Sequence, residues 1–130
     1  MTSTALARIA LGSIFLTFGL NGFYTFIPVP EFSPFMAILV SSGYIYVVKT
    51  VEVVCGLLLL ANRYVPLALV LLGPDVANIV AYHVLLDHRN WPIAIVNVTI
   101  FVFLLHAYKP CFTPLLVQHA DEQDSTEQEP

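Results

Sequence analysis

The sequence predicts an all-α fold, a four-helix transmembrane bundle with a short interfacial or re-entrant helix between spans one and two. The chain has 130 residues, of which 58% are hydrophobic and only 11% are charged, and its mean hydropathy is +0.80. An ordinary soluble domain is about 25% charged, and a domain this small leaves about a third of its surface exposed. Four apolar stretches also approach the roughly 20 residues that a helix needs to cross the hydrocarbon core. Lipid is therefore the expected solvent for most of the chain.

The four expected spans are separated by residues that end or begin helices. We place the spans at about residues 5–27, 44–61, 66–86 and 91–108, within a membrane domain of residues 1–117. Pro28 and Pro30 are expected to end the first span. Asn62 and Arg63 form a short turn, and Pro66 begins the third helix at a position where no backbone donor is needed.

The connection from Val29 to Gly43 carries its own helix signals. Ser33 and Pro34 form a start signal, an apolar run follows, and Ser41, Ser42 and Gly43 form a stop signal. This helix is too short to span a bilayer. We expect it to lie at the interface, or to re-enter it, over the outer mouth of the bundle.

The positive charges of the short loops predict the orientation of the chain. Arg8, Arg63 and Lys109 fall on one side of the expected spans, and Arg89 falls on the other. The positive-inside rule then places both termini in the cytoplasm, with the chain in the cell (inner) membrane. Residues 118–130 are acidic and lack apolar periodicity, which predicts a disordered cytoplasmic tail. The basic residues form no stripe, so no nucleic-acid partner is expected.

Polar side chains recur inside the apolar stretches at a similar depth. A charged side chain in hydrocarbon costs about 3 kcal/mol on insertion scales unless it is paired or faces the bundle interior. Lys49, Glu52 and Gly56 share one helix face by their spacing, and Asp75, Asn78 and Tyr82 repeat that spacing on the next expected span. Counting the rise per residue places the polar groups between the midplane and the outer third of the bilayer. The candidate ligand-binding set is Asn21, Lys49, Glu52, Asp75, Asn78, Tyr82 and His83.

Two carboxyl groups inside the membrane exceed what Lys49 can neutralise, so we expect Glu52 or Asp75 to hold a proton. Such a group is suited to carry protons or to donate a hydrogen bond to a ligand carbonyl. The alternative is that the polar residues only bind the helices to one another, which is worth about 0.6 kcal/mol per hydrogen bond in measured cases. Cys55 and Cys111 form no Cys-x-x-Cys motif, and no metal site is expected.

Three segments together resemble the DoxX-like membrane proteins. They are Gly19-Leu-Asn21-Gly-Phe, then Lys49-x-x-Glu52-Val-Val-x-Gly56, and then Val65 to Ile79 with Gly73-Pro74 and Asn78, followed by His83. The likeness covers about residues 5–116, and Asp75 stands where the family usually has an apolar residue. The resemblance implies a small four-helix integral membrane protein. The family's namesake is a subunit associated with a membrane thiosulfate:quinone or quinol-oxidising system, and the resemblance supplies no catalytic mechanism.

These observations favour an accessory membrane subunit that binds a small lipophilic ligand, a quinone or a lipid, and is linked to membrane redox chemistry. We expect no independent catalytic activity, and quinone is the candidate cofactor. The expected partners are the lipid bilayer, subunits of a redox complex and a second copy of the chain. Two alternatives stay open, a proton-coupled transporter-like protein and a scaffold or assembly factor with no ligand.

Overall fold

The computed structural model describes residues 2–27 and 33–119, and these residues confirm the all-α prediction. Within those two ranges the regular structure is helical, without a strand. The helices are α1 (Ser3–Phe23), α2 (Pro34–Ser42), α3 (Tyr44–Ala61), α4 (Val65–Leu85), α5 (Trp91–Ala107) and α6 (Lys109–Phe112), followed by the 3₁₀ helix η1 (Thr113–Leu116).

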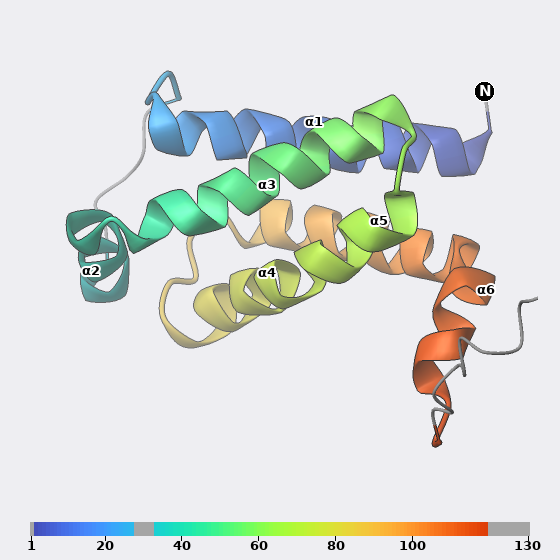
Figure 1. The fold of residues 1–130 in the computed structure, drawn as a ribbon. Coiled ribbons are helices and arrows are strands. Elements are labelled where there is room, and N and C mark those ends of the chain that lie inside the picture. Colours follow the sequence, from blue (N-terminus) through green and yellow to red (C-terminus); the bar gives the residue numbers. More distant parts are fainter. Residues whose placement is uncertain (1, 28–32, 120–130) are drawn as a thin grey trace, which may run out of the picture.

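The long helices pack together into a bundle, which is called the body of the protein below. Figure 1 shows α1 and α3 crossing at one side of the body and α4 and α5 lying at the other. In the part of the chain that the structure describes, α1, α3 and α4 are each long and apolar enough to span a membrane. A fourth span results if α5 is counted together with the bent segment Lys109–Leu116. The structure therefore contains three or four helices of the kind that a membrane bundle requires.

Glycines bring α1 and α3 into close contact. A Cβ atom added to Gly56 would lie 2.8 Å from the backbone nitrogen of Leu16 and 3.0 Å from the carbonyl oxygen of Gly12. At Gly19 an added Cβ would lie 2.8 Å from Cγ2 of Val53. Small residues at a helix interface allow the two backbones to approach closely. The van der Waals contacts made in this way help to drive the association of helices in lipid. Among the helices of the described residues, α1 and α3 accordingly make the most extensive contact.

The apolar core is formed by buried side chains from the long helices. Leu59, Leu69 and Leu104 are fully buried, and each comes from a different helix. Large apolar side chains such as Val47 and Ile95 remain more than half exposed on the outer faces of their helices. This distribution suits a protein whose outer surface contacts lipid rather than water.

The helix ends follow from local side-chain hydrogen bonds. At the start of α2, Oγ of Ser33 accepts from the backbone nitrogen of Met36 at 3.3 Å, and Gly43 ends the helix with a left-handed φ of 80°. The expected short helix between the first two spans is therefore present at residues 34–42. The first predicted span runs to Ile27, but α1 ends at Phe23. Pro28 and Pro30, expected to end that span, lie outside the described residues, as do residues 120–130 of the predicted tail.

The ends of the body differ in charge. The start of α1, the α3–α4 turn and α6 lie toward one end, and α2 and the α4–α5 loop lie toward the other (Figure 1). Arg8, Arg63 and Lys109 belong to the first group of elements, and Arg89 belongs to the α4–α5 loop. Three of these four basic residues thus lie toward one end of the body and one lies toward the other, as the sequence predicts.

Candidate functional site

A buried ion pair on α3 is the centre of the candidate site. Nζ of Lys49 lies 2.9 Å from Oε2 and 3.2 Å from Oε1 of Glu52, one helical turn further along. Glu52 is only 5% exposed, and the Lys49 side chain is 19% exposed. The aliphatic stem of Lys49 passes over Gly22 of α1, where a Cβ would lie 2.7 Å from Cδ and 3.0 Å from Cε. The glycine of one helix therefore makes room for the lysine of the next.

Asp75 of α4, a neighbouring helix, lies close enough to this ion pair to interact with it. Its carboxyl group interacts electrostatically with both Glu52 and Lys49. Its Oδ2 atom is buried and has no hydrogen-bond partner among the described residues. The three side chains together hold two carboxyl groups and one ammonium group, so the cluster carries a net negative charge unless one carboxyl holds a proton. We call Lys49, Glu52 and Asp75 the α3–α4 cluster.

The residue before Asp75 removes one backbone hydrogen-bond donor from α4. Pro74 lies inside α4 and has no N–H, so the carbonyl of Val70 loses its usual helical donor. In a membrane such a group is tolerated where protein groups or water re-satisfy it. In the part of the chain that the structure describes, no group of three or more His, Cys, Asp or Glu side chains is placed to hold a metal ion.

Asn21 is buried but serves its own helix end. Its Oδ1 accepts from the backbone nitrogens of Phe26 at 2.9 Å and Ile27 at 2.8 Å, and its Nδ2 donates to the Ile27 carbonyl at 3.3 Å. These bonds fold the chain back after α1, which is why the helix ends at Phe23. Asn78, one turn after Asp75, is exposed. The structure therefore does not bring these two amides into the α3–α4 cluster.

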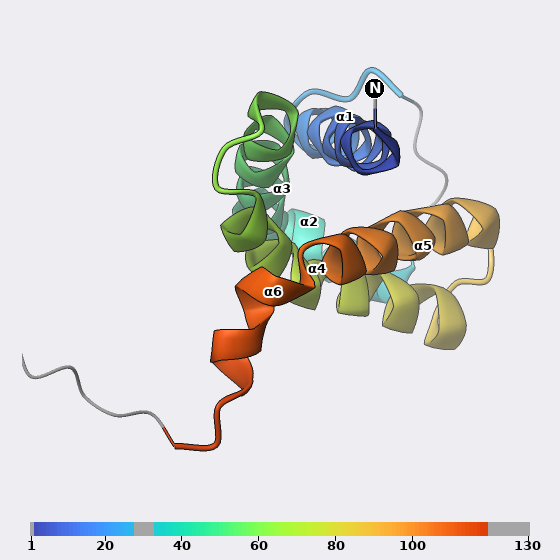
Figure 2. The ribbon, with the colours of Figure 1, turned by 90° about the vertical axis from the view of Figure 1, so that its right-hand side faces the viewer.

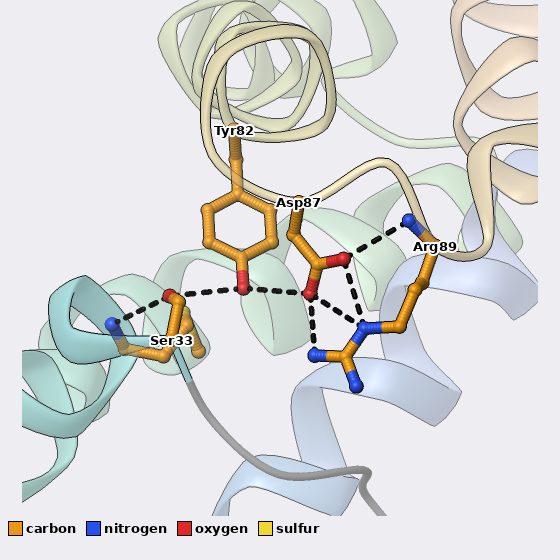
Figure 3. A network of polar contacts seen from close by, with 5 residues as sticks. Ser33, Tyr82, Asp87 and Arg89 are labelled. Atoms are coloured by element: carbon orange, nitrogen blue, oxygen red, sulfur yellow. Dashed lines mark hydrogen bonds and ion pairs between the residues drawn. The ribbon is translucent and has the colours of Figure 1, made fainter.

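Tyr82 belongs to a separate hydrogen-bond network that connects α2 to the α4–α5 loop (Figure 3). Its hydroxyl lies 3.1 Å from Oγ of Ser33 and donates to Oδ2 of Asp87 at 3.4 Å. Asp87 accepts from Nε and Nη2 of Arg89 at 2.9 and 2.7 Å. These hydrogen bonds with Arg89 hold the pKa of the Asp87 carboxyl well below its usual range. The network thereby connects the start of α2 to the end of α4 and to the α4–α5 loop.

His83 hydrogen-bonds within its own helix and lies beside Tyr82 of this network. Its Nδ1 bonds to the carbonyl oxygen of Ile79 at 2.8 Å, so Nδ1 carries the proton. The ring also lies edge-on to Tyr82, with centroids 5.5 Å apart. It contributes to an open, mostly apolar groove of about 310 Å³ between α4 and α5. The other lining residues are Val80, Val84, Trp91, Ala94, Ile95, Val98 and Thr99.

Two polar residues outside the predicted binding set, Arg8 and Asn97, are partly or fully buried in the structure. Nη1 of Arg8 donates to the carbonyl oxygens of Leu59 and Leu60, the latter at 3.4 Å, at the C-terminal end of α3. Its spacing to the glycines of α1 was the available signal, because it places Arg8 on the face that packs against α3. Asn97 of α5 is 5% exposed, and its buried Oδ1 has no partner within residues 2–27 and 33–119.

Comparison with known proteins bears on the same region. A family model described as DoxX matches residues 3–84, which include α1, α2, α3, most of α4 and all three residues of the α3–α4 cluster. No curated protein and no solved structure matches the chain.

Proposed function

The chain belongs to the DoxX family, and from that premise we propose that it is an accessory membrane subunit that binds a small lipophilic ligand of the quinone or lipid class at the α3–α4 cluster. The observation that carries this proposal is the buried Oδ2 of Asp75, which finds no partner in residues 2–27 and 33–119 and belongs to the same cluster as the Lys49–Glu52 ion pair. A buried polar atom without a partner costs about 1–3 kcal/mol. A ligand group that reached this atom would recover that free energy.

The chemistry of the cluster suits a ligand that exists in two redox forms. The ammonium of Lys49 is a donor, and Asp75 donates when protonated and accepts when ionised. A quinone offers carbonyl acceptors, and the corresponding quinol offers hydroxyl donors. The cluster can therefore hydrogen-bond to either form, and it contains no group that must itself react. This supports a binding role linked to membrane redox chemistry rather than independent catalysis.

The test is binding of a short-chain quinone analogue to the purified full-length protein in nanodiscs. Quenching of the fluorescence of the single tryptophan, Trp91, and calorimetry are the two readouts. The double variant Glu52→Gln with Asp75→Asn is expected to weaken binding at least about tenfold, the equivalent of about 1.4 kcal/mol. The control is Asp87→Asn, the same chemical change at a carboxylate outside the cluster. Equal affinity in the wild type and the double variant would remove the site.

A second function, proton-coupled transport, is favoured by one observation. The α3–α4 cluster has one carboxyl group more than its ammonium can neutralise, and ionisable residues inside membranes often form proton relays. Four spans are few for alternating access, so this function would need several copies of the chain. Proteoliposomes loaded with a pH-sensitive dye separate the two proposals. Proton flux that is abolished by Asp75→Asn supports transport, and absence of flux under an imposed gradient counts against it.

We also propose that both termini face the cytoplasm in the inner membrane, and that the protein associates with redox-complex subunits or with itself. The division of bases between the two ends supports this orientation. An impermeant thiol reagent should label the exposed Cys111 only after the inner membrane of intact spheroplasts has been permeabilised. Purification in mild detergent with mass spectrometry would identify the bound proteins and lipophilic molecules. Recovery of the chain alone would favour a scaffold without a stable partner.

A further inference from the structure

The segment that follows α5 changes direction where that helix reaches the end of a bilayer. Lys109–Leu116, formed by α6 and η1, turns by 77° from α5. The 17 residues of α5 rise about 26 Å at 1.5 Å each, close to the roughly 30 Å thickness of the hydrocarbon core. Figures 1 and 2 show the segment leaving the bundle at the end opposite α2. If α5 runs near the membrane normal, α6 and η1 run nearly along the membrane plane.

The beginning and the end of this segment have different surroundings. Tyr108 and Phe112 are partly buried and pack against the apolar core cluster. Leu115, Leu116 and Val117 are 67%, 83% and 58% exposed. The first two residues therefore attach the segment to the bundle, and the last three present an apolar surface that the described residues leave uncovered.

We propose that Lys109–Val117 lies in the lipid–water interface, with its exposed apolar side chains in the boundary between headgroups and acyl chains. Three features identify lipid as the partner: the direction of the segment, its start where the span ends, and Lys109 and Tyr108 at that point. Basic and aromatic residues are typical of the interface, where lysine meets lipid phosphates. A segment in the interface plane buries its apolar face about 5–10 Å into this boundary.

The exposed Cys111 allows a direct test in the full-length protein. Cys55 is fully buried, and Cys55→Ala leaves Cys111 as the labelled thiol. An environment-sensitive fluorophore is attached to Cys111, and the protein is reconstituted in liposomes with quenchers at the headgroup, at a shallow acyl position or near the chain end. We expect emission blue-shifted from its value in water, and strongest quenching by the headgroup and shallow labels.

Each other outcome overturns the proposal in a distinct way. Strongest quenching by the deep label would mean that Lys109–Leu116 continues the span of α5. Water-like emission without quenching would place the segment in the aqueous phase. Blue-shifted emission without quenching at any depth would mean that a protein surface covers it.

A pair of charge variants tests which side chains make the contact. Leu115→Glu with Leu116→Glu should shift the emission toward its value in water and reduce the shallow quenching at least twofold. Thr113→Glu with Gln118→Glu adds the same charge at exposed polar positions and should change both quantities less. Equal effects of the two double variants would refute the apolar contact, and far-ultraviolet circular dichroism verifies that both variants remain folded.

Discussion

A methyl group added at Gly56 should force α1 and α3 apart. The new Cβ would lie 2.8 Å from the nitrogen and 3.1 Å from the Cα of Leu16, and 3.0 Å from the carbonyl oxygen of Gly12. All three atoms are backbone, so no side chain can swing aside. Overpacking of this kind costs about 1–3 kcal/mol, and we expect the upper half of that range. The higher helix propensity of alanine returns at most about 1 kcal/mol.

Gly73→Ala is the matched control for this variant. Gly73 also lies inside a long helix, and a Cβ there would meet nothing within 4 Å. The gain in helix propensity is common to both variants, so the difference in unfolding free energy between them isolates the clash. We expect Gly56→Ala to be less stable than Gly73→Ala by about 2–3 kcal/mol.

The assay is unfolding in mixed micelles with increasing mole fraction of sodium dodecyl sulfate, followed by circular dichroism and by the fluorescence of Trp91. The Gly56→Ala protein should unfold at a clearly lower fraction of denaturing detergent than the Gly73→Ala protein. Coincident unfolding curves for the two variants would refute the conclusion that backbone contact at Gly56 sets the spacing of α1 and α3.

The remaining predictions concern the polar groups, and the same micelle assay measures stability. Lys49→Met should lower the free energy of unfolding by about 3–5 kcal/mol because it leaves the buried Glu52 unpaired. The double variant Lys49→Met with Glu52→Leu should have a stability near that of the wild type. Equal losses of stability in the two variants would show that the pair is not coupled. Asn21→Ala should lower the free energy of unfolding by about 1–2 kcal/mol, because the backbone groups of Phe26 and Ile27 lose their side-chain partner. An unchanged transition would mean that water replaces these hydrogen bonds. The lowered pKa of Asp87 gives stability that is present above the unfolded value of about 3.9 and is lost as pH falls below it. Asp87→Asn should therefore weaken the fall of the unfolding free energy with decreasing pH in the acid range. An unchanged pH dependence would mean that other carboxylates cause this fall.

Hydropathy and helix-breaking residues were sufficient to predict the all-α class and the short helix before α3. In lipid every backbone group must be satisfied within the segment or by a neighbour, so a long apolar run has few alternatives to a helix. The caps at Ser33 and Gly43 made α2 recognisable although it is too short to span. The Lys49–Glu52 contact also followed from sequence, since residues three apart on a helix are neighbours.

The sequence did not specify how each helix is rotated about its own axis, and therefore which of its residues face the interior. Asp75 and Asn78 were grouped by spacing, yet residues three apart differ by about 60° around a helix. Asp75 lies at the edge of the buried face of α4, and this rotation is enough to leave Asn78 exposed. The partners of Asn21 and Tyr82 depend on how a connection folds back, which neither depth nor periodicity specifies.

The contact of Arg8 with the last carbonyls of α3 has a consequence for biogenesis. While α1 is alone in the bilayer, its guanidinium has only headgroups or water to bind, and the carbonyls that will receive it do not yet exist as a helix end. When α3 packs against α1, the Arg8 guanidinium and the carbonyl groups at the end of α3 bond to each other. The same packing brings the glycines of the two helices into contact. The pairing of α1 with α3 therefore satisfies the Arg8 guanidinium without any contribution from α5.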